Sequence, residues 1–264
     1  MGPRPAGAAG VPERGARMNF HELHRPGAPL LLPNAWDVAS AKLFAAAGHA
    51  AVGTTSLGVA AAAGRPDGVG ASRAETLALA RLLAELPCPV TVDVEAGFSD
   101  DPAEVAGVAA TLAGYGVAGI NLEDAGGPPS LQVAKIVAIK AAAPGLFVNA
   151  RTDTYWLGRG SYDETVWRLE AYVAAGADGV FVPGLRTPDT IRALVAAVDA
   201  PLNVLIAPDG PTVTELAGLG VARISCGSLL YRAALTAAVG VLGAVASAGP
   251  LPTDVLNYAE VARL

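Results

Sequence analysis

The chain has 264 residues, 52% of them hydrophobic, which is enough for one large domain with a substantial core. Its net charge of -6 gives no electrostatic reason to expect nucleic acid or an anionic membrane surface as a partner. Gly, Pro or charged residues interrupt every apolar run, so we expect no membrane-spanning segment.

Residues 1–17 are rich in Pro, Gly, Ala and Arg and resemble neither a secretory signal nor a folded element. We expect them to form a flexible tail, followed by a folded domain over 18–248 and a helical extension over 249–264. Cys88 and Cys226 lie far apart beside apolar strand sequence. That placement favours free thiols and a reducing compartment, so we expect a cytoplasmic protein.

Strands and helices alternate along the domain. After a short amphipathic helix over 19–24, the predicted strands are 29–33, 50–53, 89–97, 117–122, 146–150, 178–184, 201–205 and 221–225. The predicted helices are 38–47, 72–86, 101–114, 131–143, 161–175, 187–198, 212–219 and 229–248, with a long loop or broken helix over 59–70. Eight such units, each of roughly 20 to 35 residues, predict an α/β fold, the (β/α)8 TIM-type barrel, rather than an open doubly wound sheet.

Ionisable residues follow three consecutive strands. Asp93 and Glu95 end the 89–97 strand, Glu123 follows the next strand, and Arg151 follows the one after. Two residues that are two positions apart on a strand share a face, so we expect Asp93 and Glu95 to point the same way. Parallel strands end at one edge of the sheet, so the charges are expected to converge there. The strand-end set as a whole is Asp93, Glu95, Glu123, Asp124, Arg151, Asp153 and Asn203.

The residue types at these strand ends restrict the chemistry. His21, His24 and His49 lie elsewhere, so zinc is disfavoured, and Lys42, Lys135 and Lys140 all fall in helices, which disfavours a Schiff base. Oxygen ligands completed by water suit Mg²⁺, or Mn²⁺ in its place.

Arg151 has two interpretations. It is either an ion pair that links neighbouring strands or a clamp on a substrate carboxylate or phosphonate beside the metal. Thr54, Thr55 and Ser56, at the end of the second strand, offer hydroxyls and backbone N–H groups to an anion, or they bond their own backbone. A metal beside an arginine clamp suits enolate chemistry on an α-oxo acid.

The chain resembles the isocitrate lyase and phosphoenolpyruvate mutase superfamily over about residues 20–244. The segments that carry the resemblance are 34–37 (Asn-Ala-Trp-Asp), 55–59 leading to 64–67, 93–98 (Asp-Val-Glu-Ala-Gly-Phe), 121–124 (Asn-Leu-Glu-Asp) and 150–153 (Ala-Arg-Thr-Asp). The resemblance implies a Mg²⁺-dependent barrel that swaps a C-terminal helix in a dimer or tetramer and acts on small carboxylates through an enolate.

The resemblance also implies roles for individual residues. Asp93 is expected to bind the metal directly, and Glu95 and Glu123 to hold it through water. The catalytic candidates are Arg151, Asp67 and Glu123. The substrate-binding candidates are Thr55, Ser56, Leu57, Trp36, Asp93, Arg151 and Asn203.

One departure concerns the family's gating loop. Where family lyases carry a Lys-Lys-Cys-Gly-His type loop with a catalytic cysteine, residues 125–130 read Ala-Gly-Gly-Pro-Pro-Ser, and Cys88 precedes its strand and cannot replace that cysteine. Carbon–carbon cleavage of a small oxo or hydroxy carboxylate is the first hypothesis. Phosphorus–carbon chemistry, with Ser225, Gly227 and Ser228 as a phosphate cradle, is the second. A barrel that binds an oxo acid without chemistry is the third.

Overall fold

The structure, a computed structural model, describes residues 19–264, and the predicted tail over 1–17 lies outside that range. The strands are β1 Leu30–Leu32, β2 Asn34–Ala35, β3 Val52–Thr54, β4 Val90–Asp93, β5 Gly119–Glu123, β6 Phe147–Arg151, β7 Gly179–Phe181, β8 Leu202–Leu205 and β9 Arg223–Ser225. The helices are η1 Phe20–Leu23, α1 Val38–Ala46, α2 Ser56–Ala62, α3 Arg73–Leu83, α4 Pro102–Tyr115, α5 Pro129–Ala142, α6 Tyr162–Ala174, α7 Pro188–Ala197, α8 Val213–Gly218, α9 Leu229–Ala246 and α10 Tyr258–Val261.

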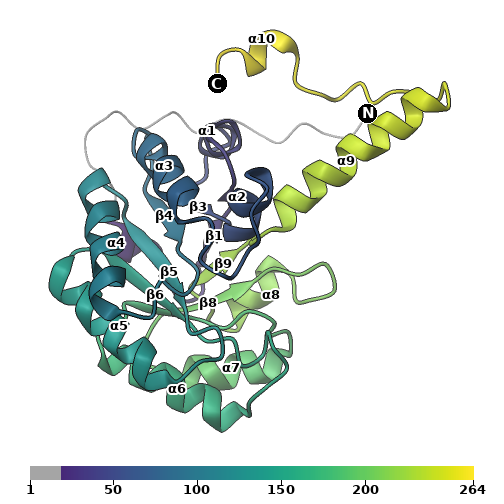
Figure 1. The fold of residues 1–264 in the computed structure, drawn as a ribbon. Coiled ribbons are helices and arrows are strands. Elements are labelled where there is room, and N and C mark those ends of the chain that lie inside the picture. Colours follow the sequence, from purple (N-terminus) through teal and green to yellow (C-terminus); the bar gives the residue numbers. More distant parts are fainter. Residues whose placement is uncertain (1–18) are drawn as a thin grey trace.

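All strands pair in parallel, in the order β1-β9-β8-β7-β6-β5-β4-β3-β2, and helices surround them (Figure 1). The predicted first strand is split at Pro33 into β1, which pairs with β9, and β2, which pairs with β3. The Asn34 side chain spans this seam, because its Nδ2 donates to Thr54 O while its Oδ1 accepts from the N–H groups of Cys226 and Gly227. The (β/α)8 barrel prediction is confirmed.

Alternate strand positions face opposite sides of the barrel wall. Val92, Ile120, Val148 and Val180 belong to the main core cluster together with apolar residues of the surrounding helices. Thr91, Asn121, Asn149 and Arg223, at the intervening positions, are buried polar residues. The barrel interior is therefore polar at its centre, and the apolar core lies mainly between strands and helices.

Local chemistry explains where several helices begin. Pro at the first helical turn starts α4, α5 and α7, where a missing N–H costs nothing. One boundary differs from the sequence prediction. A regular helix, α2, begins at Ser56 and runs to Ala62, into the segment predicted as a loop or broken helix.

Helix α9 projects from the barrel and the chain then turns back toward α1 (Figure 1). By length and composition it is the one helix in residues 19–264 that could cross a membrane, with a mean hydropathy of 1.7, and Tyr231 is its one buried residue. The expectation that no segment is long and apolar enough is therefore wrong for α9. A single helix of this kind is weak evidence for membrane insertion.

His24 closes the amino-terminal end of the barrel. Its ring stacks on Phe147 with centroids 4.3 Å apart, and its Nδ1 lies 2.9 Å from Phe20 O. Burial, followed by the positive charge of Arg223, lowers the pKa of His24 from 6.5 to about 3. The folded protein therefore holds this imidazole neutral at pH values where the unfolded chain protonates it.

This difference predicts a pH-dependent loss of stability. Between pH 6.5 and 3 the unfolded state binds the extra proton, so stability falls as the pH drops, by about 2 kcal/mol at pH 5 for a shift of this size. His24→Phe keeps an aromatic ring and removes the titration. Urea unfolding at pH 7 and pH 5 is expected to show a smaller loss for His24→Phe than for the wild type, and equal losses would contradict the assignment.

Candidate metal and substrate site

The predicted convergence of strand ends is confirmed for β5 and β6. Glu123 and Arg151 are partners in the register of these strands, and Arg151 Nη1 lies 2.7 Å from Glu123 Oε2. On the neighbouring strand β4, Asp93 is the register partner of Asn121, two residues before Glu123. Three successive strands thus bring two carboxylates and a guanidinium to the carboxyl end of the barrel, where TIM-barrel enzymes carry their active sites.

Arg151 is held by two carboxylates. Besides its contact with Glu123, its Nε donates to Asp153 Oδ1 at 2.6 Å, and its guanidinium carbon lies 5.7 Å from the ring centroid of Phe181. Although burial opposes the charge, the neighbouring acids raise the pKa of Arg151. The ion-pair interpretation of Arg151 is confirmed, and the substrate-clamp role stays a prediction.

Unlike Glu123 and Asp153, Asp93 forms no ion pair with any residue of 19–264. Its backbone N–H donates to Thr54 Oγ1 at 2.9 Å, and its Oδ1 accepts the N–H of Glu95 at 3.2 Å. Burial raises the pKa of Asp93, the Arg151 charge lowers it, and Asp67 and Glu95 raise it further by repulsion. A cation placed here would remove both the desolvation penalty and the repulsion.

Glu95 does not follow the expected strand geometry. Strand β4 ends at Asp93, and Glu95 has a left-handed backbone with φ of 51°, so the two-residue periodicity does not extend to it. Its carboxylate accepts the N–H of Gly70 at 2.8 Å and the hydroxyl of Ser72 at 2.7 Å. Glu95 therefore fixes the loop that contains Asp67, and both of its oxygens already have a partner.

Glu123 and Asp67 complete the acidic group. Burial and the repulsion of Asp93, Asp153 and Asp67 outweigh the attraction of Arg151 and raise the pKa of Glu123 to about 8. Asp67 is exposed on the loop between α2 and α3, yet its charge acts on both Asp93 and Glu123. The loop therefore adds the charge of a further carboxylate to the site.

The donor set fits a hard cation held largely through water. In residues 19–264 no three His, Cys, Asp or Glu side chains converge closely enough to form a metal cluster by themselves. The reason is that Gly70 and Ser72 donate hydrogen bonds to the Glu95 carboxylate, and Arg151 forms an ion pair with the Glu123 carboxylate. Mg²⁺ normally retains several waters and takes one or two carboxylates directly, so Asp93 as direct ligand with Glu95 and Glu123 behind water matches its chemistry.

The predicted carboxylate-binding segment opens helix α2. Ser56 and Leu57 are its first residues, and their N–H groups have no acceptor within the helix, which makes them available to an anion. Thr55 is buried and its side chain makes no cap bond. Trp36 packs against Tyr231, with ring centroids 5.3 Å apart. The Cβ atom of Trp36 also lies against Gly58, so a residue larger than glycine would not fit at position 58. Trp36 therefore supports the start of α2.

Asn203 lies deeper than a strand-end position implies. It is 1% exposed on β8, and neither its Oδ1 nor its Nδ2 has a hydrogen-bond partner among the described residues. It is the register partner of Phe181 and Arg223. Asn203 belongs to the polar interior beneath the site.

The loop after β5 is short and fixed. Asp124 accepts hydrogen bonds from Tyr172 Oη at 2.7 Å, Arg168 Nη1 at 3.1 Å and the N–H of Gly126 at 3.0 Å. Arg168 Nη1 also donates to Gly127 O at 2.9 Å. A segment held by this many bonds is suited to a rigid wall and poorly suited to a moving lid, in keeping with the missing gating sequence.

A pocket of about 210 Å³ lies beside this loop and includes Glu123, Asp124 and Lys135. Lys135 belongs to helix α5, as predicted, but its ammonium reaches this pocket and donates to Ala96 O at 2.9 Å. The Lys135 ammonium is therefore closer to the acidic group than the position of Lys135 in a helix indicates. Its bond to Ala96 holds the turn after β4.

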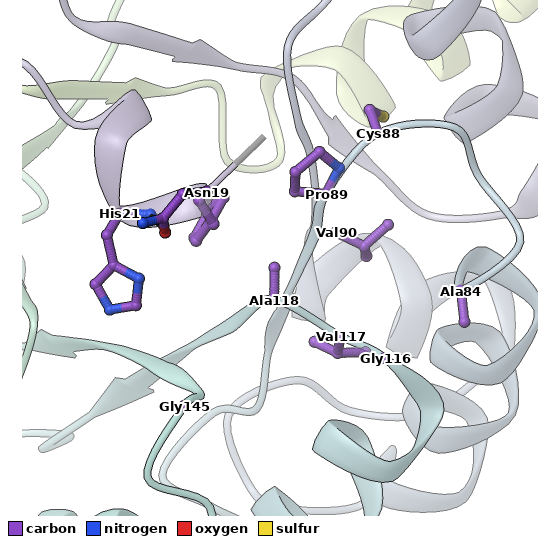
Figure 2. A pocket seen from close by; sticks show the side chains of 11 residues that line it. Asn19, His21, Ala84, Cys88, Pro89, Val90, Gly116, Val117, Ala118 and Gly145 are labelled. Carbon is purple, nitrogen blue, oxygen red and sulfur yellow. Dashed lines mark hydrogen bonds between the residues drawn. The ribbon is translucent and has the colours of Figure 1, made fainter. Parts of the chain in front are cut away.

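Neither cysteine replaces the missing gating cysteine. Cys88 lines a pocket of about 310 Å³ at the opposite end of the barrel, near Asn19 and His21 (Figure 2). Cys226 follows β9, and burial raises the pKa of both thiols. Both are free, as expected. The suggested phosphate cradle after β9 is weakened, because Gly227 already donates its N–H to Asn34.

Sequence reasoning gave no specific role to three residues that shape the site. Asp153 is the second carboxylate on Arg151, Ser72 fixes Glu95, and Arg223 is fully buried inside the barrel. Only Asp153 carried a sequence signal, because it follows a strand. Ser72 and Arg223 act through contacts across the fold that no local pattern indicates.

The sequence is similar to that of several known proteins. A family model described as phosphoenolpyruvate phosphomutase matches residues 20–246. An uncharacterized protein of Mycobacterium tuberculosis is 48% identical over 94% of this chain and 96% of its own length. The 2-methylisocitrate lyase of Bacillus subtilis is 31% identical over 69% of this chain and 64% of its own length.

Solved structures show the same barrel. A putative phosphonomutase from Burkholderia cenocepacia J2315 superimposes with a TM-score of 0.80, at 40% identity over 85% of this chain and 97% of the other. Oxaloacetate acetylhydrolase in complex with its product oxalate gives a TM-score of 0.83, at 25% identity over 93% and 92%. The names of these matches include a phosphomutase, a lyase and an acetylhydrolase of oxaloacetate. The chain belongs to the phosphoenolpyruvate phosphomutase family and, with it, to the isocitrate lyase and phosphoenolpyruvate mutase superfamily of enzymes.

Proposed function

We propose that the protein is a Mg²⁺-dependent carbon–carbon lyase that cleaves a small 2-oxo or hydroxy carboxylate through a pyruvate-like enolate. The proposal is based on the group of Asp93, Glu123 and Arg151 on three neighbouring strands, in which Asp93 has no ion-pair partner within residues 19–264. The 2-methylisocitrate lyase among its relatives supports the same reaction class.

The chain's own groups fit the steps of such a reaction. The N–H groups of Ser56 and Leu57 would bind the substrate carboxylate, and Arg151 would exchange one carboxylate partner for a substrate oxygen. Mg²⁺ beside Asp93 would supply the Lewis acid that polarises the oxo group. Phe181 and the buried wall behind Arg151 keep water from weakening these contacts.

The shortened loop after β5 limits the range of reactions. It carries no cysteine, histidine or lysine that could protonate the departing fragment, so cleavage of a bulky hydroxy tricarboxylate is disfavoured. Phosphorus–carbon chemistry is the second candidate, favoured by the family match itself. A barrel that binds an oxo acid without turnover is the third, favoured by the missing gating residues.

Product analysis separates these candidates. Purified protein with Mg²⁺ is incubated with a panel of oxo acids, hydroxy di- and tricarboxylates and phosphonates, and products are followed by ¹H and ³¹P NMR. The proposal predicts a new pyruvate-like or oxo-acid signal from a carboxylate substrate and no change in the ³¹P spectrum. Phosphonate turnover would support the second candidate, and binding of an oxo acid without turnover the third.

We also propose that α9 docks on a second copy of the chain, giving a dimer or tetramer in the cytoplasm. Leu235, Val239 and Leu242 recur at the spacing of one helix face and are 51%, 68% and 68% exposed. Monomeric soluble proteins rarely leave such a stripe uncovered. The two free cysteines favour a reducing compartment.

A further inference from the structure

Arg223 is a fully buried guanidinium inside the barrel. It is 0% exposed, and its Nη2 donates to Asn121 Oδ1 at 3.1 Å. Three strands separate β9 from β5 in the sheet order, so this bond crosses the barrel interior. Among residues 19–264, its Nε and Nη1 have no hydrogen-bond partner and no carboxylate lies within ion-pair distance. A buried charge without a partner is costly, so its presence requires a reason.

The position of Arg223 relates it to the proposed site. Its bonding partner Asn121 is paired in register with Asp93, and side chains in register on adjacent strands lie about 5 Å apart. At the other end, the Arg223 charge lowers the pKa of His24, which closes the barrel bottom. The guanidinium therefore lies inside the barrel, between His24 at the amino-terminal end and Asp93 at the carboxyl end.

Arg223 also fixes the orientation of Asn121. Asn121 Oδ1 accepts from Arg223 Nη2 at 3.1 Å and from Asn149 Nδ2 at 2.8 Å, which uses both of its lone pairs. A flipped amide would place N–H groups against two donors. The two N–H bonds of Asn121 Nδ2 therefore point away from Arg223 and Asn149.

We propose that Arg223 is a positioning residue for the anionic substrate: it holds Asn121 as an N–H donor at the floor of the site and places a positive charge beneath the acids. The inference rests on the proposed function. Asp67, Asp93, Glu95 and Glu123 attract a metal ion but repel a carboxylate substrate, and Arg223 offsets part of that repulsion from below. Its charge should therefore weaken cation binding and strengthen anion binding.

Calorimetry on Arg223→Met tests this pair of opposite effects. Mg²⁺ is titrated into the free protein, and oxalate, a planar dianion that resembles an enolate of an oxo acid, is titrated at saturating Mg²⁺. We expect Mg²⁺ affinity to rise by about two- to tenfold and oxalate affinity to fall by about 10- to 100-fold. Arg223→Lys, which keeps the charge without the planar fork, should recover the Mg²⁺ affinity of the wild type and only part of the oxalate affinity.

Two further variants keep the test decisive. Arg168→Met removes another buried guanidinium, one paired with Asp124 outside the barrel, and should not move the two affinities in opposite directions. If Arg223→Met does not fold, Asn121→Asp replaces the proposed donor by a carboxylate that can pair with Arg223, and the same opposite shifts are expected. Loss of both affinities in these variants would overturn the inference, whereas a wild type that binds neither Mg²⁺ nor oxalate would overturn the proposed function itself.

Discussion

Replacing Asp93 with Asn is expected to abolish Mg²⁺-dependent oxalate binding. The change preserves the size of the side chain but removes the charge that faces the proposed cation, while the bonds to Thr54 and Glu95 involve backbone N–H groups that remain. A direct carboxylate ligand of a hard dication contributes on the order of 100-fold or more to its affinity. Calorimetry with Mg²⁺, and then with oxalate at high Mg²⁺, measures both losses.

Asp178→Asn is the matched control for this prediction. Asp178 precedes β7 at the opposite end of the barrel, where it contacts Lys140 and His21. Its loss should lower the stability of the fold and leave both affinities within about twofold of the wild type. Unchanged Mg²⁺ affinity in Asp93→Asn would remove Asp93 from the metal site and with it the reason for placing Arg151 beside a metal.

Charges placed on helix α9 are expected to separate the subunits. Val239→Glu combined with Leu242→Glu inserts two carboxylates into the exposed apolar stripe of α9. Burying an unpaired carboxylate and losing two apolar contacts costs at least roughly 3 kcal/mol per interface, or about 100-fold in the dissociation constant. Light scattering after size-exclusion chromatography should give a dimer or tetramer for the wild type and a monomer for the double variant.

Ala237→Glu is the control for α9, because residue 237 lies on the side of the helix opposite to Val239 and Leu242. It adds a charge to the same helix and should preserve the assembly better than the double variant does. A monodisperse wild-type monomer without detergent would contradict the docking proposal. Sedimentation of the wild type with lipid vesicles, lost in the double variant, would instead identify α9 as a membrane-binding helix.

The residues at the strand ends could be predicted from the sequence, because each of them follows an apolar run that marks a buried strand and the direction in which the strand runs. Three such runs end in Asp93, Glu123 and Arg151, and parallel pairing brings neighbouring ends together without further information. The barrel follows from the same regular alternation. The sequence prediction treated glycines as interruptions of apolar runs. Gly240 and Gly243 lie within the continuous helix α9, so they did not reveal its length, and its exposure could not be predicted from them.

Other features depend on geometry that a local pattern does not contain. Glu95 leaves the strand direction because its backbone is left-handed, and Gly97, at φ of 92°, continues that turn against Val105, where a side chain would not fit. Arg223 meets Asn121 across 102 positions of sequence. The Asn34 seam joins the first strand to the last. Long-range contacts of this kind require the closed barrel before they can be recognised.

In the proposed site, acids from neighbouring strands surround one divalent cation with Arg151 beside it. A crystal soaked with Mn²⁺ and oxalate shows the position of the cation through the anomalous scattering of manganese. We expect one anomalous peak within ligand distance of an Asp93 carboxylate oxygen, with oxalate between the peak, Arg151 and the N–H groups of Ser56 and Leu57. A manganese peak elsewhere, or oxalate bound away from Arg151 with no metal at Asp93, would contradict it.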